Sequence, residues 1–129
     1  MALFREFDTS SGKQVFVGRD AENNEELVKQ INNNEFVLHT SKPGSPFVNI
    51  KAPSSEVSKE DIKEASIFCA KFSQDWRDNK KDIVVHIFLG KDISKDKGMK
   101  QGTFGVKSFK EIKVKKEDIL GFEKMLTGK

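Results

Sequence analysis

The sequence contains few of the residues on which several protein classes depend. Among its 129 residues there is one cysteine, Cys69, so neither an intramolecular disulfide nor a zinc site of several cysteines is possible. No apolar run approaches the roughly eighteen residues that cross a bilayer, and the N-terminal residues lack the basic and apolar stretches of a secretion signal. We therefore expect a cytoplasmic protein with no membrane partner.

The short motifs of common enzymes are also missing. There is no GxxxxGK[ST] phosphate loop, no GxSxG nucleophile elbow and no HExxH metal motif. The two histidines, His39 and His86, fall in different expected strands without aligned carboxylates, which makes a poor metal site. Glu35 and His39 are the best pair for an RNA-processing enzyme, but residues four apart on a strand lie about 13 Å from each other. We predict no catalytic residue, no metal site and no cofactor.

The residues that are present suit one compact fold. Hydrophobic residues make up 36% of the chain and include eleven phenylalanines, which is enough for a core and too much for a disordered chain. A chain of 129 residues is short for two ordinary domains. We therefore expect residues 1–129 to form one domain.

Positive charge is concentrated near the C-terminus. Residues 91–116 hold nine lysines against three acids, a net charge of +6, whereas the whole chain carries only +3. Such an asymmetry attracts phosphate backbones and strengthens their binding by counterion release. The alternative is a solvated, lysine-rich strand edge that discourages aggregation.

The first half of the chain predicts short strands around one helix. Residues 3–7 and 14–17 flank a turn-forming cluster and indicate a hairpin. Asp20 is a typical N-cap for a helix that ends at the three asparagines from Asn32 to Asn34. Residues 35–40 and 47–50 alternate as strands, and the loop between them, residues 41–46, contains two prolines and a glycine.

The second half begins with the clearest helix. Ser58 and Asp61 resemble a capping box, and an apolar stripe extends this helix over residues 59–76. Residues 83–89 are nearly all apolar and predict a central strand buried on both faces, with His86 in the core. A lysine-rich loop over 91–101 precedes a hairpin of residues 102–107 and 111–115. Ile119, Phe122 and Leu126 share one side of a short C-terminal helix. This order predicts an α+β domain with a largely antiparallel mixed sheet and two main helices.

Four segments, in order from about Phe4 to Val114, resemble the NFACT-R family. The first motif is Gly18 and Arg19 followed by a helix with Asn24 and Leu27, and the second is Glu35-Phe-Val-Leu-His39 with Pro43-Gly44-Ser45 after it. The third is Glu64-Ala65 through Phe72-Ser73, and the fourth is the loop Lys95-Asp-Lys-Gly-Met-Lys-Gln-Gly102. Val37 stands where the family has an aromatic residue, and Pro46 stands where it has a histidine.

The resemblance implies an RNA-binding module that contacts tRNA or ribosomal RNA, with the large ribosomal subunit as a further partner, in translation or ribosome-associated quality control. The sequence does not contain the N-terminal domain and coiled coil with which larger family members recruit tRNA for C-terminal tailing, so we do not expect tailing by this chain alone. A protein-interaction adaptor on ribosomal partners is an alternative function. The sequence leaves the choice of nucleic acid and the oligomeric state open.

The expected binding surface combines family positions with charge. Arg19 joins a strand to a helix N-terminus, where backbone N–H groups favour an anion, although it can instead pair with Glu22. His39 ends a strand and can stack on a base or contact phosphate, although a strand histidine is commonly structural. Phe104 and Phe109 offer stacking faces. The predicted nucleic-acid-binding residues are Arg19, Asn24, His39, Lys42, Ser45, Lys91, Lys95, Lys97, Lys100 and Lys107.

Overall fold

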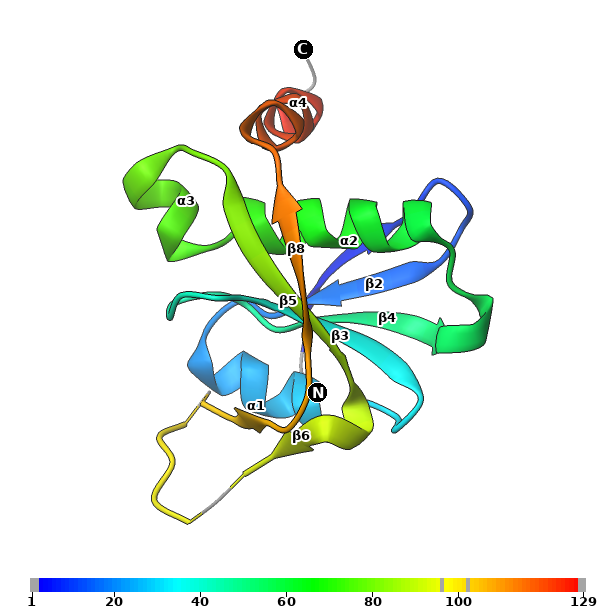
Figure 1. The fold of residues 1–129 in the computed structure, drawn as a ribbon, viewed down its shortest axis with the longest axis vertical. Coiled ribbons are helices and arrows are strands. Elements are labelled where there is room, and N and C mark those ends of the chain that lie inside the picture. The colour runs from blue at the N-terminus through cyan, green and yellow to red at the C-terminus, as the bar shows by residue number, and fades with distance from the viewer. Residues whose placement is uncertain (1–2, 96, 102, 128–129) are drawn as a thin grey trace.

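The strands of the domain form one main antiparallel sheet. In the computed structural model, which describes residues 3–95, 97–101 and 103–127, this sheet has the strand order β1-β2-β4-β3-β5-β8 (Figure 1). Its strands are β1 Arg5–Asp8, β2 Gln14–Val17, β3 Glu35–Thr40, β4 Val48–Pro53, β5 Ile83–Leu89 and β8 Lys110–Val114. Every neighbouring pair is antiparallel, which confirms the expected α+β class.

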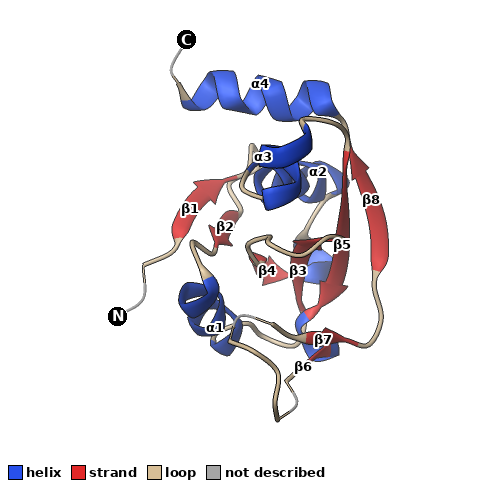
Figure 2. Cartoon of the chain, turned by 90° about the vertical axis from the view of Figure 1, so that its left-hand side faces the viewer, coloured by secondary structure: helices blue, strands red, loops and turns tan. Residues whose placement is uncertain are grey.

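Helices cover both faces of this sheet. The helices are α1 Ala21–Lys29, α2 Lys59–Lys71, α3 Gln74–Asn79 and α4 Lys116–Leu126, with short 3-10 turns at Ser54–Glu56 and Gly90–Asp92. Figure 2 shows α2, α3 and α4 stacked on one side, and α1 with the small β6–β7 sheet on the other. No helix in the described part of the chain is long and apolar enough to cross a membrane.

The alternation of side chains along the strands divides the core into two clusters. On the α2 face, Leu38 and Val85 of the sheet pack with Phe68 and Trp76 from the helices. The cluster on the α1 face is smaller and contains Leu27, Val37, Phe47 and Phe88. Because the smaller cluster occupies only part of the α1 face, the sheet retains an incompletely covered area beside it.

Local signals in the sequence define the helix starts. The Asp20 carboxylate accepts a hydrogen bond from the Asn23 N–H at 2.8 Å and caps α1, as predicted. Ser58 and Asp61 form the predicted capping box at α2. The predicted first hairpin is also present, with β1 paired to β2.

The expected helix over residues 59–76 is wrong in its extent. The structure has two helices, because α2 ends at Lys71 and the Ser73 hydroxyl accepts a hydrogen bond from the Trp76 N–H to start α3. The apolar stripe continues through this break, since Trp76 is fully buried in the same core as Cys69. Periodicity alone therefore did not reveal the change of direction.

The expected second hairpin is also wrong. β7, Gly105–Val106, pairs with β6, Ile93–Ser94, whereas β8 pairs with β5 at the edge of the main sheet. This arrangement lets Ile112 and Val114 of β8 reach the main core while Ile93 and Val106 pack on the smaller cluster. Gly102, the expected start of the hairpin, lies outside the described residues.

β5 is buried fully on the α2 face and only in part on the α1 face. Ile83, Val85 and Ile87 are buried in the main core, and on the other face Phe88 is buried whereas Val84 and His86 are only partly covered. The core position predicted for His86 is therefore wrong, because the apolar run concealed the partly open positions on the α1 face. Similarly, the predicted C-terminal helix is present, but Leu126 is exposed.

Candidate functional site

The incompletely covered area of the sheet forms the floor of a pocket. The loop of residues 41–46 projects between α1 and α3 and makes one wall (Figure 1). The β2–α1 junction and the C-terminal part of α3 contribute further residues, and Phe104 and Phe109 lie on the side of the small sheet. The volume of about 670 Å³ is within the range of small-ligand sites.

Three arginines from separate elements line this pocket. Arg5 comes from β1, Arg19 from the β2–α1 junction and Arg77 from α3. None of the three guanidinium groups has a carboxylate within ion-pair distance among the described residues, so the proposed pairing of Arg19 with Glu22 is not present. Clustered like charges without such partners favour binding of an anion.

Phe72 helps to hold two of these arginines. The Arg5 guanidinium lies over the Phe72 ring, 4.2 Å from the centroid, and Arg5 Nη1 donates to the Gly18 carbonyl at 2.6 Å. Arg77 Nη1 donates to the Phe72 carbonyl at 3.4 Å, and its Nη2 donates to Gln74 Oε1 at 2.8 Å. Burial lowers the pKa of Arg5, and the positive charges of Arg19 and Arg77 lower it further. The positive charges beside Arg5 therefore favour the binding of an anion at this cluster.

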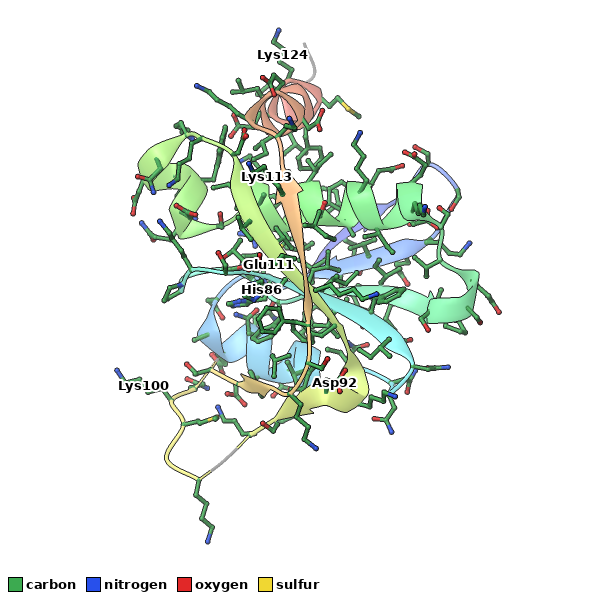
Figure 3. All side chains as sticks on the ribbon, in the orientation of Figure 1. His86, Asp92, Lys100, Glu111, Lys113 and Lys124 are labelled. Atoms are coloured by element: carbon green, nitrogen blue, oxygen red, sulfur yellow. The ribbon has the colours of Figure 1, made fainter. Side chains whose placement is uncertain are left out.

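The two histidines lie opposite each other on the pocket floor. His39 of β3 is the cross-strand partner of His86 of β5, and His86 is in turn opposite Glu111 of β8. His86 Nε2 lies 3.3 Å from a Glu111 carboxylate oxygen, and Figure 3 shows these two residues side by side on neighbouring strands. His39 and His86 both line the pocket. The structure therefore gives a site position to the histidine that the sequence analysis assigned to the core.

His39 is held in one orientation. Its Nδ1 lies 2.8 Å from the Thr40 carbonyl oxygen. A carbonyl only accepts, so Nδ1 carries the hydrogen and Nε2 is an acceptor in the neutral ring. Burial lowers the pKa of His39 below its ordinary value, and the neighbouring His86 adds to this effect. His39 therefore contributes a neutral, polar aromatic ring at neutral pH.

Aromatic rings extend from the histidines across the pocket. Phe109 stacks on His86 with the ring centroids 3.9 Å apart and the planes inclined by 18°. Phe47 packs against His39 on one side and meets Phe104 edge-on at 5.2 Å. Phe109 remains 47% exposed, so much of its ring is accessible to a ligand.

Asn24 and Ser45, two predicted binding residues, line the pocket but have partners within the fold. Asn24 is buried, and its Oδ1 accepts a hydrogen bond from the Phe47 N–H at 3.1 Å. The Ser45 hydroxyl accepts from the Thr40 N–H and donates to the Pro46 carbonyl. Both side chains thus fix the shape of the pocket wall. Their contact with RNA remains a prediction.

The expected backbone anion site at α1 is already filled by side chains. The Asp20 carboxylate caps the helix, and Asn23 Oδ1 accepts a hydrogen bond from the Arg19 N–H at 3.0 Å. Gly18 beside them is closely packed, because a Cβ atom there would collide with Asn24 Oδ1. Arg19 therefore offers its side chain rather than the helix N-terminus to a ligand.

The loop of residues 41–46 is seated on α3. The Gln74 N–H donates to the Gly44 carbonyl at 2.9 Å. Gly44 has a φ of +85°, and a Cβ at this position would lie 2.7 Å from the Gln74 Cβ. Lys42 in the same loop lines the pocket and lies 3.9 Å from the Asp75 carboxylate. The predicted residue Lys42 is thus placed at the site.

The five lysines predicted near the C-terminus do not line the pocket. These are Lys91, Lys95, Lys97, Lys100 and Lys107. Figure 3 shows Lys100 on the β6–β7 loop, well away from His86 on the sheet. The end of this loop nevertheless reaches the pocket through Gln101 and Thr103. The contact of these five lysines with RNA stays a prediction.

Lys95 differs from its neighbours, because its ammonium group organises the loop. Lys95 Nζ lies 2.7 Å from Glu25 Oε2 and donates to the carbonyls of Lys100 and Thr103. It also lies 4.5 Å from the centroid of the Phe104 ring. These contacts connect the loop to α1. Asp96, the next residue in the family-like loop motif, lies outside the described residues.

The sequence analysis missed Arg5, Arg77 and His86. Arg5 and Arg77 lie 72 positions apart in the sequence and come together only in the fold, where both contact Phe72. No local motif marks either of them. The only sequence signal for His86 was that a polar residue stands within an apolar strand. Its position beside the pocket depends on its cross-strand pairing with His39.

The groups considered for catalysis are engaged in the fold. Glu35 forms an ion pair with Lys51 at 2.8 Å and accepts a hydrogen bond from the Asn32 N–H, at the opposite end of β3 from His39. Cys69 is buried, and burial raises its thiol pKa to about 12, so it is not a thiolate at neutral pH. No three potential metal ligands meet within the described residues.

Comparison with known proteins assigns the family. The model of the family described as the NFACT protein RNA binding domain matches residues 3–108, which is most of the chain. The chain belongs to the NFACT RNA-binding domain family. The suspected resemblance is therefore confirmed, and membership supports a general RNA-binding role for this NFACT domain. The match includes every predicted binding residue and also Arg5, Arg77 and His86.

A solved structure has the same fold as this NFACT domain. The C-terminal part of the fibronectin/fibrinogen-binding protein from Streptococcus suis superposes with a TM-score of 0.81 at 20% sequence identity. The superposition covers 94% of this chain and 49% of that one, so the NFACT domain spans about half of the solved structure. A search of curated proteins found no match.

Proposed function

We propose that the chain binds tRNA or ribosomal RNA through the pocket on the α1 face of its sheet, in translation or ribosome-associated quality control. In this proposal the arginines contact phosphate groups, and the exposed lysines of the β6–β7 loop guide the RNA towards them. The chain acts as a binding module in the cytoplasm and catalyses no reaction.

One observation carries the proposal. Arg5, Arg19 and Arg77 converge on one pocket, and among the described residues no carboxylate forms an ion pair with them. Guanidinium groups bind phosphate with paired N–H donors, so three in one place form a strong phosphate site. Asp20 supplies a neighbouring negative charge that only partly offsets theirs.

Charge reversal tests this proposal. Arg19→Glu should weaken the binding of a tRNA-like stem-loop about tenfold or more, since a hydrogen bond to a charged group contributes about 1.5 to 3 kcal/mol. Lys63→Glu makes the same change in charge at an exposed position of α2, on the opposite face of the sheet, and should have a small effect. Equal losses in the two variants would contradict a localised site.

The adaptor alternative is separated by nuclease treatment. Ribosomal material captured by the chain should be lost after RNase digestion if RNA carries the interaction. Capture that persists after digestion and survives Arg19→Glu would favour a protein-interaction adaptor. Sequencing of crosslinked RNA from cells identifies tRNA or ribosomal RNA as the partner.

A further inference from the structure

We infer that the pocket holds a single unstacked nucleotide of the bound RNA, with its phosphate at the arginines and its base against Phe109. This inference rests on the proposed RNA-binding function and specifies the form of RNA that is recognised. It predicts a preference for RNA with a bulged, looped or terminal nucleotide over a continuous duplex.

The size of the pocket supports a single nucleotide. A volume of about 670 Å³ accommodates a small ligand but excludes a double helix. In a duplex the bases are stacked inside, and an A-form major groove is too narrow for side chains to read. Only a nucleotide that leaves the stack presents its base to a concave site. A flat duplex-binding surface would require no such hollow.

The aromatic side of the pocket provides a stacking surface. Phe109 is backed by His86 in a nearly parallel arrangement, with their ring centroids 3.9 Å apart. Because this contact fixes the orientation of Phe109, its exposed surface is prepared for a second ring. Phe109 is 47% exposed at the rim of the pocket, so its ring is accessible to a ligand. Every nucleobase has a face that can stack there.

The polar side of the same pocket matches the sugar and phosphate. The three arginines line the same pocket and can contact the phosphate, and His39 of β3 lines it as well. With Nδ1 donating to the Thr40 carbonyl, the neutral ring has its acceptor at Nε2. Such an acceptor suits a ribose 2′-hydroxyl or an exocyclic amine, which adds polar recognition to stacking.

A double-mutant cycle tests the contact between base and ring. The probes are two RNA hairpins that differ only at one bulged position, which carries an adenine in the first and an abasic ribose in the second. Dissociation constants are measured for the unchanged protein and for Phe109→Ala. Leu120→Ala, an exposed apolar truncation on α4, serves as the matched control. Circular dichroism verifies that each variant is folded.

Removing the base should weaken binding to the unchanged protein and to Leu120→Ala about tenfold, in line with the stacking energy of one base. Phe109→Ala should bind both hairpins nearly equally, because base and ring act through the same contact. Equal affinity of the unchanged protein for both hairpins would overturn the inference. So would a tenfold loss of affinity in Phe109→Ala when the base is removed. If either of these two outcomes occurs while Arg19→Glu still weakens RNA binding, the proposed function survives without the nucleotide pocket. If no hairpin binds at all, the proposed function itself fails.

Discussion

His39 of β3 and His86 of β5 face each other across two neighbouring antiparallel strands, on the floor of a pocket with three arginines. The pairing brings together a residue from a family-like motif and one that the sequence places within an apolar strand. His86 supports Phe109, whereas His39 is anchored to the Thr40 carbonyl. Both histidines are thus held in place by other residues of the fold and line the pocket.

The pH dependence of folding provides the first prediction. Burial lowers the pKa of His39 in the folded state below 6.5, so the unfolded chain takes up this proton more readily. The resulting stability is fully present above pH 6.5 and is lost as the pH falls towards the folded pKa. Thermal denaturation should show a steeper fall in Tm between neutral pH and mildly acidic pH for the unchanged protein than for His39→Gln. Parallel curves would show that His39 does not carry this effect.

The loop of residues 41–46, which forms one wall of the pocket, provides the second prediction. Gly44→Ala places a Cβ on a residue with φ of +85° and 2.7 Å from the Gln74 Cβ. We expect a loss of about 1 to 3 kcal/mol in the free energy of unfolding, together with weaker RNA binding. Gly12→Ala is the control, because Gly12 also has a positive φ, +93°, but its Cβ would meet nothing within 4 Å. Denaturant unfolding of both variants separates the collision of the new Cβ with Gln74 from the backbone strain that both variants share. A larger loss in the free energy of unfolding for Gly12→Ala than for Gly44→Ala would contradict this packing.

The C-terminal helix provides the third prediction. Trp76 is fully buried, and its Nε1 donates to Glu123 Oε2 of α4 at 2.8 Å. Glu123→Ala leaves this donor unsatisfied and should lower the free energy of unfolding by about 1 to 3 kcal/mol. Lys124→Ala changes an exposed neighbour on the same helix and should alter it by less than about 0.5 kcal/mol. Equal stability of the two variants in denaturant would show that α4 is not docked in this way.

The lysine-rich loop provides the fourth prediction. Lys97 and Lys100 are exposed, whereas Lys95 is bonded to Glu25 and to two carbonyls. Replacing Lys97 and Lys100 with Ala should leave Tm nearly unchanged and reduce the slope of log affinity against log salt by about 1.4 for single-stranded RNA. Lys95→Ala should also lower the Tm. A salt slope that is unchanged in the double variant would exclude these two lysines from phosphate binding.

The predictable parts of the fold are those with local signals. β3 has the bounds expected from its pattern, and Asp20 and Ser58 cap the predicted helices. In contrast, the pairing of β7 with β6 depends on which core each short strand can reach. The break at Ser73 was masked because an apolar stripe continued across it. The helix caps could thus be predicted from the sequence, whereas the partners of the short strands depend on tertiary packing.

The site was predictable only in part. Family-like motifs indicated Arg19 and His39, and both line the pocket. Arg5 and Arg77 carry no motif and reach the pocket through tertiary structure alone. Lysine density indicated a basic loop correctly, but it did not reveal that Lys95 is committed to internal contacts. The chemistry of the pocket therefore follows from the arrangement of distant segments.

Crosslinking followed by mass spectrometry tests the central claim, that RNA is bound in this pocket, most directly. Irradiation of the chain with a 4-thiouridine-labelled RNA hairpin should attach nucleotides to peptides that contain His39, Phe104 or Phe109, because these residues line the pocket. Arg19→Glu should reduce these adducts. Adducts confined to α2 and α4, with none on the pocket residues, would contradict the account.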